Sequence, residues 1–347
     1  MNSVQRVTLE SVAVHAGVSR QTVSNAINAP ELVRADTLER VRACIKGLGY
    51  RPSTAARQLR TRRSRVLGFA LPPARDGFNY AVGDRFIHAL TEAAQLHGYR
   101  ITLFTAGSDE QEIAQYEDLL HGADIDGLVL TNTHHGDPRT HWLGERDVPF
   151  VTFGRPWNDG QGGTAHPWVD VDGAAGTALA VEHLRSLGHE RIAFLGWPSG
   201  SGVGDDRRAG WEHEMRAGGT SEGDLTRWRA EAPEDVALAG EIATRLVEDV
   251  APTAIVCVSD SVALAVLNAL RMLGRTAAVV GFDDTPAAAA VGLSSLAQPI
   301  ATAATTALGL VLSQIGGPHQ PATTEHVLLS PVLVERTSSD VAPTSNH

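Results

Sequence analysis

The segment from Thr8 to Arg60 most constrains the fold, because residues that begin and end helices recur at short intervals along it. Thr8 is a helix-capping residue type ahead of an apolar pattern at helical spacing. Gly17 follows where a helix end favours positive φ. Ser19 then caps a second helix, whose buried face is marked by Val23, and a third helical pattern follows at about 36–48, with Asp36 as its expected cap. Two short helices joined by a glycine-containing turn predict a helix-turn-helix, whose second helix is sized for the DNA major groove.

Polar side chains occupy the early turns of that second helix, away from its apolar face. They are Arg20, Gln21 and Asn25. Arginine forms paired hydrogen bonds with guanine, and glutamine or asparagine does so with adenine. The pattern therefore predicts that this helix contacts base edges, the alternative being a structural three-helix bundle with a solvated polar face.

The distribution of charge favours the DNA-binding interpretation. Residues 1–65 contain 12 basic and 4 acidic side chains, whereas the rest of the chain contains 17 basic and 36 acidic ones. A solvated face would not concentrate one sign of charge in this way. A basic head on an acidic body is typical of a protein that places only its head on nucleic acid.

From Val66 onward, apolar strand-like runs alternate with amphipathic helical patterns, which predicts parallel sheets with helices on both faces. The expected strands are V-L-G-F-A-L, R-I-T-L-F-T-A, G-L-V-L-T, P-F-V-T-F, W-V-D-V-D, R-I-A-F-L-G, T-A-I-V-C-V and A-A-V-V-G-F. The expected helices are 86–97, 110–120, 173–187, 206–217, 236–250, 261–273 and 300–315.

Composition excludes several other classes of protein. A chain of 347 residues is too long for one core. Cys44 and Cys257 lie far apart, as reduced cysteines of a cytosolic protein do, and the three histidines His134, His135 and His141 are too scattered to predict a metal site. We find neither an apolar run of membrane-spanning length nor a secretion signal, and we expect a cytoplasmic, nucleoid-associated bacterial protein with no membrane partner and no cofactor.

Two strings carry a more specific signal: T-L-E-S-V-A…A-G-V-S-R-Q-T-V-S-N-A-I-N and L-E-R-V-R…L-G-Y-R-P-S-T-A-A-R-Q-L-R-T. Together they resemble the DNA-binding headpiece of the lac/galactose repressor family of bacterial regulators. The resemblance implies a homodimer on a palindromic double-stranded operator, with paired hinge helices that each insert Leu59 into the minor groove. The DNA contacts that it implies, with those read from the residues, are Thr8, Ser19, Arg20, Gln21, Thr22, Asn25, Ser53, Leu59 and Arg60.

The resemblance also implies the rest of the fold: an all-α helix-turn-helix headpiece followed by a periplasmic-binding-protein-like α/β core of two lobes, each a doubly wound parallel sheet. The expected parts are a headpiece (1–50), a hinge helix and linker (51–65), a two-lobe effector-binding and dimerisation domain (66–335) and a disordered polar tail (336–347). Lobe 1 is expected at about 66–166 and 299–322, and lobe 2 at about 170–295 and 323–335. The chain would then cross between the lobes near 166–172, 294–299 and 321–325.

A small-molecule effector is expected between the lobes, beyond the carboxyl ends of the strands. The resemblance suggests that Arg207 bonds vicinal hydroxyls or a carboxylate and that Asp283 accepts hydrogen bonds, whereas Asp284 is structural. Many relatives carry Asn where this chain has Ser259, so the side chain at this position reaches less far toward an effector; we expect Asp260 to cap the following helix. The full set of expected effector contacts is Tyr80, Arg155, Trp157, Arg207, Ser259 and Asp283. Six tryptophans among 18 aromatic residues favour a sugar as the effector.

Other functions remain open at this stage. The effector could be a purine or another metabolite, and it could release or tighten DNA binding. The run G-S-G-V-G at 200–204 follows a strand and precedes a helix, as a dinucleotide-binding loop does, but its spacing is not G-x-G-x-x-G. A nucleotide-binding enzyme with an added DNA-binding domain is therefore a weaker alternative, and we expect a protein that is not an enzyme.

Overall fold

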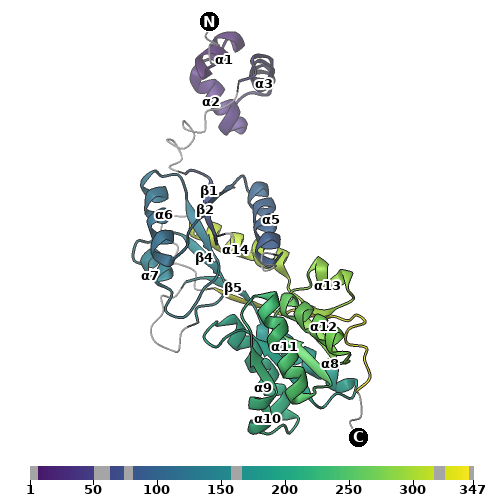
Figure 1. Cartoon of the computed structure of the whole chain (residues 1–347). Coiled ribbons are helices and arrows are strands. Elements are labelled where there is room, and N and C mark those ends of the chain that lie inside the picture. Colours follow the sequence, from purple (N-terminus) through teal and green to yellow (C-terminus); the bar gives the residue numbers. More distant parts are fainter. Residues whose placement is uncertain (1–6, 51–62, 74–80, 158–165, 316–324, 344–347) are drawn as a thin grey trace, which may run out of the picture. The chain divides into compact units, whose positions relative to one another are not determined.

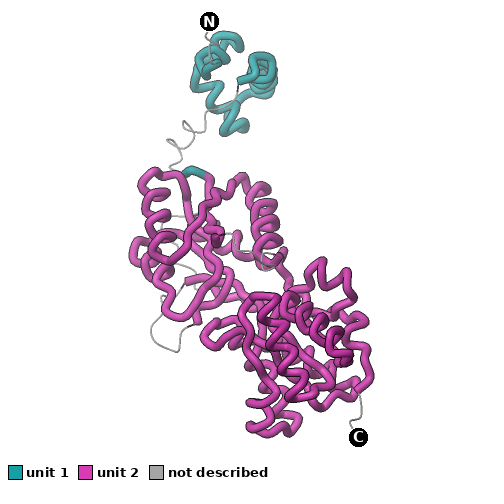
Figure 2. Tube along the Cα trace, in the orientation of Figure 1, with its two compact units in different colours: residues 1–64 teal, residues 65–347 magenta. Residues whose placement is uncertain are grey.

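The computed structural model describes residues 7–50, 63–73, 81–157, 166–315 and 325–343. The chain divides into two compact units, residues 1–64 and residues 65–347 (Figure 2).

The first unit is a small helical bundle. Its elements are α1 (Leu9–Ala16), α2 (Arg20–Asn28), a 3-10 turn η1 (Pro30–Leu32) and α3 (Ala35–Leu48). The predicted caps of the first two helices are confirmed: the hydroxyls of Thr8 and Ser19 accept hydrogen bonds from the amides of Ser11 and Thr22. Gly17 ends α1 at φ 63°, where only glycine is unstrained. The three helices share one apolar core.

The third helix begins one residue earlier than predicted and is capped differently. Asp36 was expected to supply the cap, but α3 begins at Ala35 and Arg34 holds the capping position without a side-chain hydrogen bond. Asp36 instead accepts a hydrogen bond of 2.7 Å from the amide of Thr37, inside the first turn. That bond lowers the pKa of Asp36, and a carboxylate there also interacts favourably with the helix dipole.

The second unit contains two six-stranded sheets. The first sheet has the strand order β11-β5-β4-β3-β1-β2, and all its paired strands are parallel. Its strands are β1 (Val66–Leu71), β2 (Arg100–Thr105), β3 (Gly127–Leu130), β4 (Phe150–Phe153), β5 (Trp168–Val171) and β11 (His326–Leu329). Its helices are α5 (Ala81–Leu96), α6 (Asp109–His121), α7 (Pro138–Gly144) and α14 (Ile300–Ile315). Helices α5 and α14 cover one face of the sheet, and α6 and α7 cover the other (Figure 1).

The second sheet has the order β12-β10-β9-β8-β6-β7 and is parallel except for its β12 edge. Its strands are β6 (Ile192–Gly196), β7 (Arg229–Glu231), β8 (Ala254–Cys257), β9 (Ala278–Phe282), β10 (Ser294–Ala297) and β12 (Val332–Val334). Its helices are α8 (Gly173–Ser186), α9 (Val203–Ala217), α10 (Glu222–Arg227), α11 (Val236–Val250), α12 (Asp260–Leu273) and α13 (Pro286–Ala290). Both sheets are doubly wound, and the predicted fold class is confirmed.

One of the predicted crossings between the lobes needs correction. Strand β5 belongs to the first sheet, so the first crossing follows Val171 and lies within the predicted range of 166–172. Strand β11 pairs in parallel with β5, so the third crossing lies between Leu329 and Val332 and not at 321–325. Sequence periodicity misses this exchange because β11 and β12 are short edge strands separated by two residues.

The predicted disordered tail is wrong for residues 336–343. Ser338 accepts a hydrogen bond from the amide of Val279 at 2.8 Å, and its hydroxyl accepts one from the amide of Ser294. Ser339 is 2% exposed, and Arg336 pairs with Asp284 at 2.6 Å. The segment therefore belongs to the second lobe, while residues 344–347 lie outside the described part. Within the described part of the chain, we find no helix that is both long and apolar enough to cross a bilayer.

This packing gives a test of the tail. Deletion of residues 336–347 would leave buried backbone and hydroxyl groups beside β9 and β10 unpaired, each at a cost of about 1–3 kcal/mol. We expect the midpoint of urea unfolding to fall clearly, whereas deletion of residues 344–347 alone leaves it unchanged. Equal midpoints for both deletions would contradict the packed tail.

Candidate DNA-binding and effector sites

The first candidate site is a polar hollow of about 330 Å³ on the headpiece. It is lined by Val18, Ser19, Thr22, Asn25, Leu32, Val33, Arg34 and Thr37. Three of the predicted DNA contacts thus meet at one surface, together with a guanidinium and a further hydroxyl. Hydrogen-bond donors and a positive charge suit the oxygen atoms of a DNA backbone.

Two predicted base-contacting residues are already paired on the helix surface. The side-chain amide of Gln21 donates to the side-chain oxygen of Asn25 at 2.9 Å, one helical turn further on. The bond fixes the orientation of both amides, and it leaves one amide hydrogen on Gln21, two on Asn25 and the side-chain oxygen of Gln21 for a base edge. Arg20 is exposed beside them. The predicted hinge contacts Ser53, Leu59 and Arg60 lie outside the described residues.

The second candidate site lies where the carboxyl ends of the second sheet meet the first lobe. We call it the interlobe junction and define it by Arg155, Asp170, Trp197, Asp206, Arg207, Glu234, Ser259, Asp283 and Gln298. Parallel strands bring their carboxyl ends to one edge, so residues that follow β6, β7, β8, β9 and β10 converge there.

Arg207, on α9, is the buried cation of this junction and is 5% exposed. Its guanidinium lies 3.6 Å from the ring centroid of Phe282, donates to the carbonyl of Val258 at 2.5 Å and reaches Asp283 at 3.7 Å. Burial lowers its pKa, and neighbouring carboxylates oppose that shift. Its Nε has no hydrogen-bond partner among the described residues, so one buried donor remains for a ligand.

Asp283 follows β9 in a strained conformation, with φ of 116°. Its carboxyl group accepts a hydrogen bond of 2.6 Å from Gln298, the residue after β10. Burial raises its pKa to about 7, although the Arg207 charge opposes this. Asp284, predicted to be structural, makes the ion pair with Arg336.

Glu234 is a junction residue that the sequence analysis missed. Its carboxylate accepts hydrogen bonds from the indole of Trp197 and from the hydroxyl of Ser259, and burial raises its pKa. Glu234 follows β7, a three-residue strand that has no clear sequence pattern. The sequence showed Glu234 only as an acidic residue in a segment between two predicted helices.

Ser259 is fully buried, and its hydroxyl also accepts a hydrogen bond from the amide of Val262. It therefore caps α12, and the prediction that Asp260 is the cap is wrong. Asp260 instead accepts hydrogen bonds from Ser295 and from the amide of Thr285, which tie the loop after β9 to the second sheet. The Ser259 hydroxyl thus accepts the hydrogen bond that caps α12 and donates one to the carboxylate of Glu234.

Arg155 spans the two lobes. It donates to Asp170 of β5 at 2.6 Å and to Asp206 of α9 at 3.2 Å. Trp157 packs against the start of α9, the helix that carries Asp206. Its indole covers Gly202, which has φ of 65°, so closely that an added Cβ atom there would lie 2.7 Å from the ring. Tyr80 lies outside the described residues.

The loop that contains G-S-G-V-G is shaped by this contact. Helix α9 begins at Val203, three residues before the predicted start, and Gly202 occupies its capping position. Because the indole of Trp157 covers Gly202, the loop serves contact between the lobes in this conformation.

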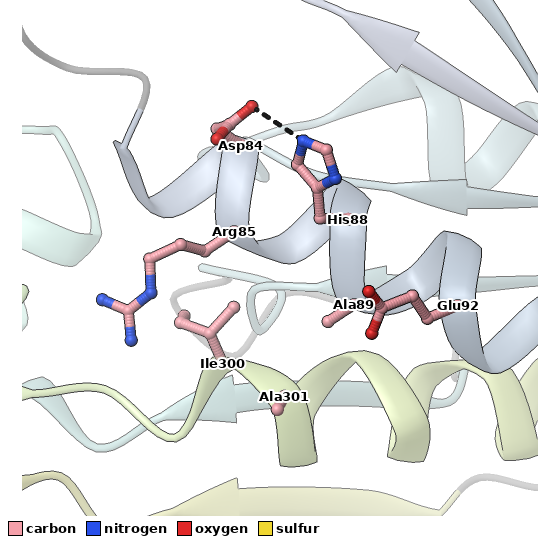
Figure 3. Close-up of a pocket in the computed structure, with 7 residues that line it drawn as sticks. All are labelled: Asp84, Arg85, His88, Ala89, Glu92, Ile300 and Ala301. Atoms are coloured by element: carbon pink, nitrogen blue, oxygen red, sulfur yellow. Dashed lines mark ion pairs between the residues drawn. The ribbon is translucent and has the colours of Figure 1, made fainter.

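A second hollow, of about 360 Å³, lies between α5 and α14 on the first lobe (Figure 3). It is lined by Asp84, Arg85, His88, Ala89, Glu92, Ile300 and Ala301. Arg85 also crosses to the second lobe, where it donates to the carbonyl of Asp283 at 2.9 Å. Most of the residues that line this hollow are exposed to solvent. The junction contains the buried, unpaired Nε of Arg207, so the junction is the better candidate for the effector site.

One cluster has metal-ligand spacing. Asp109, His134 and Asp137 approach one another on the first lobe. However, Arg139 lies 2.6 Å from Asp137 and 3.6 Å from Asp109, and Asp109 also contacts His134 at 3.0 Å. The guanidinium already supplies the positive charge, so an ion-pair cluster accounts for these residues.

Comparison with known proteins matches both parts of the chain. The pattern of bacterial regulatory proteins of the lacI family matches residues 8–53, and that of the periplasmic binding protein-like domain matches residues 181–339. The HTH-type transcriptional regulator CelR of Thermobifida fusca is 33% identical over 95% of this chain and 96% of its own length.

Two solved structures are similar over nearly the whole chain. A complex of the transcriptional regulator CelR with cellobiose is 28% identical and has a TM-score of 0.68, covering 96% of this chain and 100% of that one. The lac repressor dimer bound to operator and the anti-inducer ONPF is 25% identical and has a TM-score of 0.79, covering 96% of this chain and 99% of that one. With a lacI-type headpiece, a periplasmic-binding-protein-like core and a relative that matches along almost its full length, the chain belongs to the LacI family of bacterial transcriptional regulators.

Proposed function

We propose that this regulator is a repressor that binds a palindromic operator as a homodimer and responds to a sugar held at the interlobe junction. The observation that carries the proposal is the pairing of a polar, basic helix-turn-helix surface with a junction that has a buried unpaired donor. The operator-bound lac repressor dimer supports the dimeric arrangement. Operator binding would place the protein at the bacterial nucleoid.

Sequence specificity is assigned to the exposed side of α2. The Gln21–Asn25 pair would meet an adenine and Arg20 a guanine, while Ser19 and Thr22 beside Arg34 would meet phosphates. Thr8 caps α1, and the amide groups at the start of that helix would meet a DNA phosphate. Ser53, Leu59 and Arg60 are proposed to act in the minor groove, where an apolar wedge kinks the duplex.

The junction chemistry supports a polyhydroxy ligand. The Nε of Arg207 can donate to a hydroxyl oxygen, and the carboxyl groups of Asp283 and Glu234 can exchange hydrogen bonds with hydroxyl groups. Trp157 presents an indole N–H that has no partner among the described residues. The CelR complex contains cellobiose, which supports a saccharide for this chain as well.

Control of DNA binding would follow from the contacts between the lobes. A ligand at the junction competes for Arg155, Asp206 and Arg207, so it changes the balance between lobe arrangements. A coupling of about 1–3 kcal/mol is sufficient for regulation, and it acts equally in both directions. The same chemistry could serve a purine or another neutral metabolite, which is the second candidate effector.

The first experiment selects bound DNA from a random pool with the full-length protein. We expect a palindrome, and we expect Gln21→Ala to weaken binding to it by about 1–3 kcal/mol because a paired base contact is lost. Binding to bulk genomic DNA should not change. Glu39→Gln on the exposed face of α3 is the control; selection without any enriched sequence would refute the operator proposal.

The second experiment tests the effector site. Arg207→Ala should leave operator affinity intact but remove the response to sugars, since the unpaired donor is lost. Operator binding is measured by fluorescence anisotropy while a panel of neutral mono- and disaccharides is added. An undiminished response in the variant would show that the effector binds elsewhere.

The raised pKa of Asp283 gives a pH-dependent prediction. Its folded pKa of about 7 exceeds the ordinary 3.8, so the folded state binds the extra proton between these values. The associated stability is fully present below pH 3.8 and is lost as pH rises through 7. Asp283→Asn keeps an acceptor for Gln298 but cannot ionise, so we expect its melting temperature relative to that of the wild type to rise between pH 5 and pH 8. A constant difference across this range would contradict the shift.

A further inference from the structure

The interlobe junction contains more acidic groups than basic ones. Four carboxylates influence the charge of Arg207: Asp283, Asp170, Glu234 and Asp206. The guanidinium groups of Arg155 and Arg207 lie within ion-pair distance of three of them, and Arg85 reaches the backbone carbonyl of Asp283.

Each guanidinium is already engaged. Arg155 lies between Asp170 and Asp206, at 2.6 and 3.2 Å. Arg207 is shared between Asp283 and a carbonyl, and Arg85 donates to backbone carbonyls. No positive charge is left in excess to receive an anionic ligand.

Glu234 differs from the other three carboxylates in the groups that it contacts. Its carboxylate is partly buried and receives an indole N–H and a hydroxyl, both neutral donors. No described Arg, Lys or His side chain lies within ion-pair distance of it. The charge of Arg207 acts on Glu234 from beyond ion-pair distance, whereas Asp170, Asp206 and Asp283 each lie within ion-pair distance of a guanidinium.

We propose that Glu234 is a specificity-determining residue of the effector site, which makes the junction select neutral or cationic polyhydroxy compounds and reject acidic ones. A hydroxyl or ammonium group donates to a carboxylate, whereas a ligand carboxylate or phosphate lacks a donor and is repelled. The inference rests on the proposed effector function and narrows its chemical class, because it excludes uronates and sugar phosphates.

A purely structural role of Glu234 makes a different prediction. If the carboxylate only held Trp197 and Ser259 in place, its replacement would alter affinity for all sugars alike. Glu234→Gln retains an oxygen that accepts from either donor but removes the charge. The ratio between the affinities for a neutral and an acidic sugar therefore separates selection by charge from positioning.

The test uses the full-length protein and isothermal titration calorimetry at pH 7.5. The probes are cellobiose, the disaccharide in which one of its primary alcohols is oxidised to a carboxylate, and the disaccharide in which one of its hydroxyls is replaced by an amine. We expect the wild type to bind the acid at least about tenfold more weakly than cellobiose, and Glu234→Gln to reduce that ratio about tenfold. The control is Glu241→Gln, an exposed residue of α11 in the same lobe, which should leave the ratio unchanged.

The outcomes distinguish this inference from the proposed function. An acid that binds the wild type as tightly as cellobiose, or a ratio unchanged in Glu234→Gln, overturns the inference while sugar binding stands. If none of the three disaccharides binds a protein that still binds operator, the saccharide proposal fails and the inference falls with it.

Discussion

The buried guanidinium of Arg207 is the group on which the junction depends. A charge in a low-dielectric site is stable only with hydrogen bonds and opposite charges around it. The carbonyl after β8, the ring at the end of β9 and Asp283 supply them, and all three come from adjacent parallel strands. The Arg207 charge is therefore stabilised only when β8 and β9 lie side by side. The same strand order places the groups that a ligand at the junction would meet.

The chain path makes the two lobes dependent on each other. Strand β11 completes the first sheet and, after two residues, the chain enters β12 at the edge of the second. The segment after β12 then supplies Arg336 and Ser338 to the loops beyond β9 and β10. Three short crossings of the chain therefore connect the two lobes. Short connections of this kind suit rotation of one lobe relative to the other about a hinge.

Local chemistry explains which parts were predictable. The caps Thr8 and Ser19 act within three residues of themselves, so the headpiece could be predicted from sequence. Strands β11 and β12 are defined only by partners more than 30 residues away, and so were missed. Arg207 and Asp283 were indicated by the family resemblance, whereas Glu234 depends on Trp197 and Ser259, which only the fold brings near it.

Arg155 shows how a residue of the predicted effector set can have a second task. It was expected to contact the effector, and in this structure it joins Asp170 to Asp206 across the lobes. Burial raises the pKa of Asp206, so this ion pair is held in a costly environment. A ligand of the proposed kind would therefore compete with a contact whose desolvation cost opposes its Coulomb attraction. Such a balance allows a modest ligand affinity to shift the arrangement of the lobes.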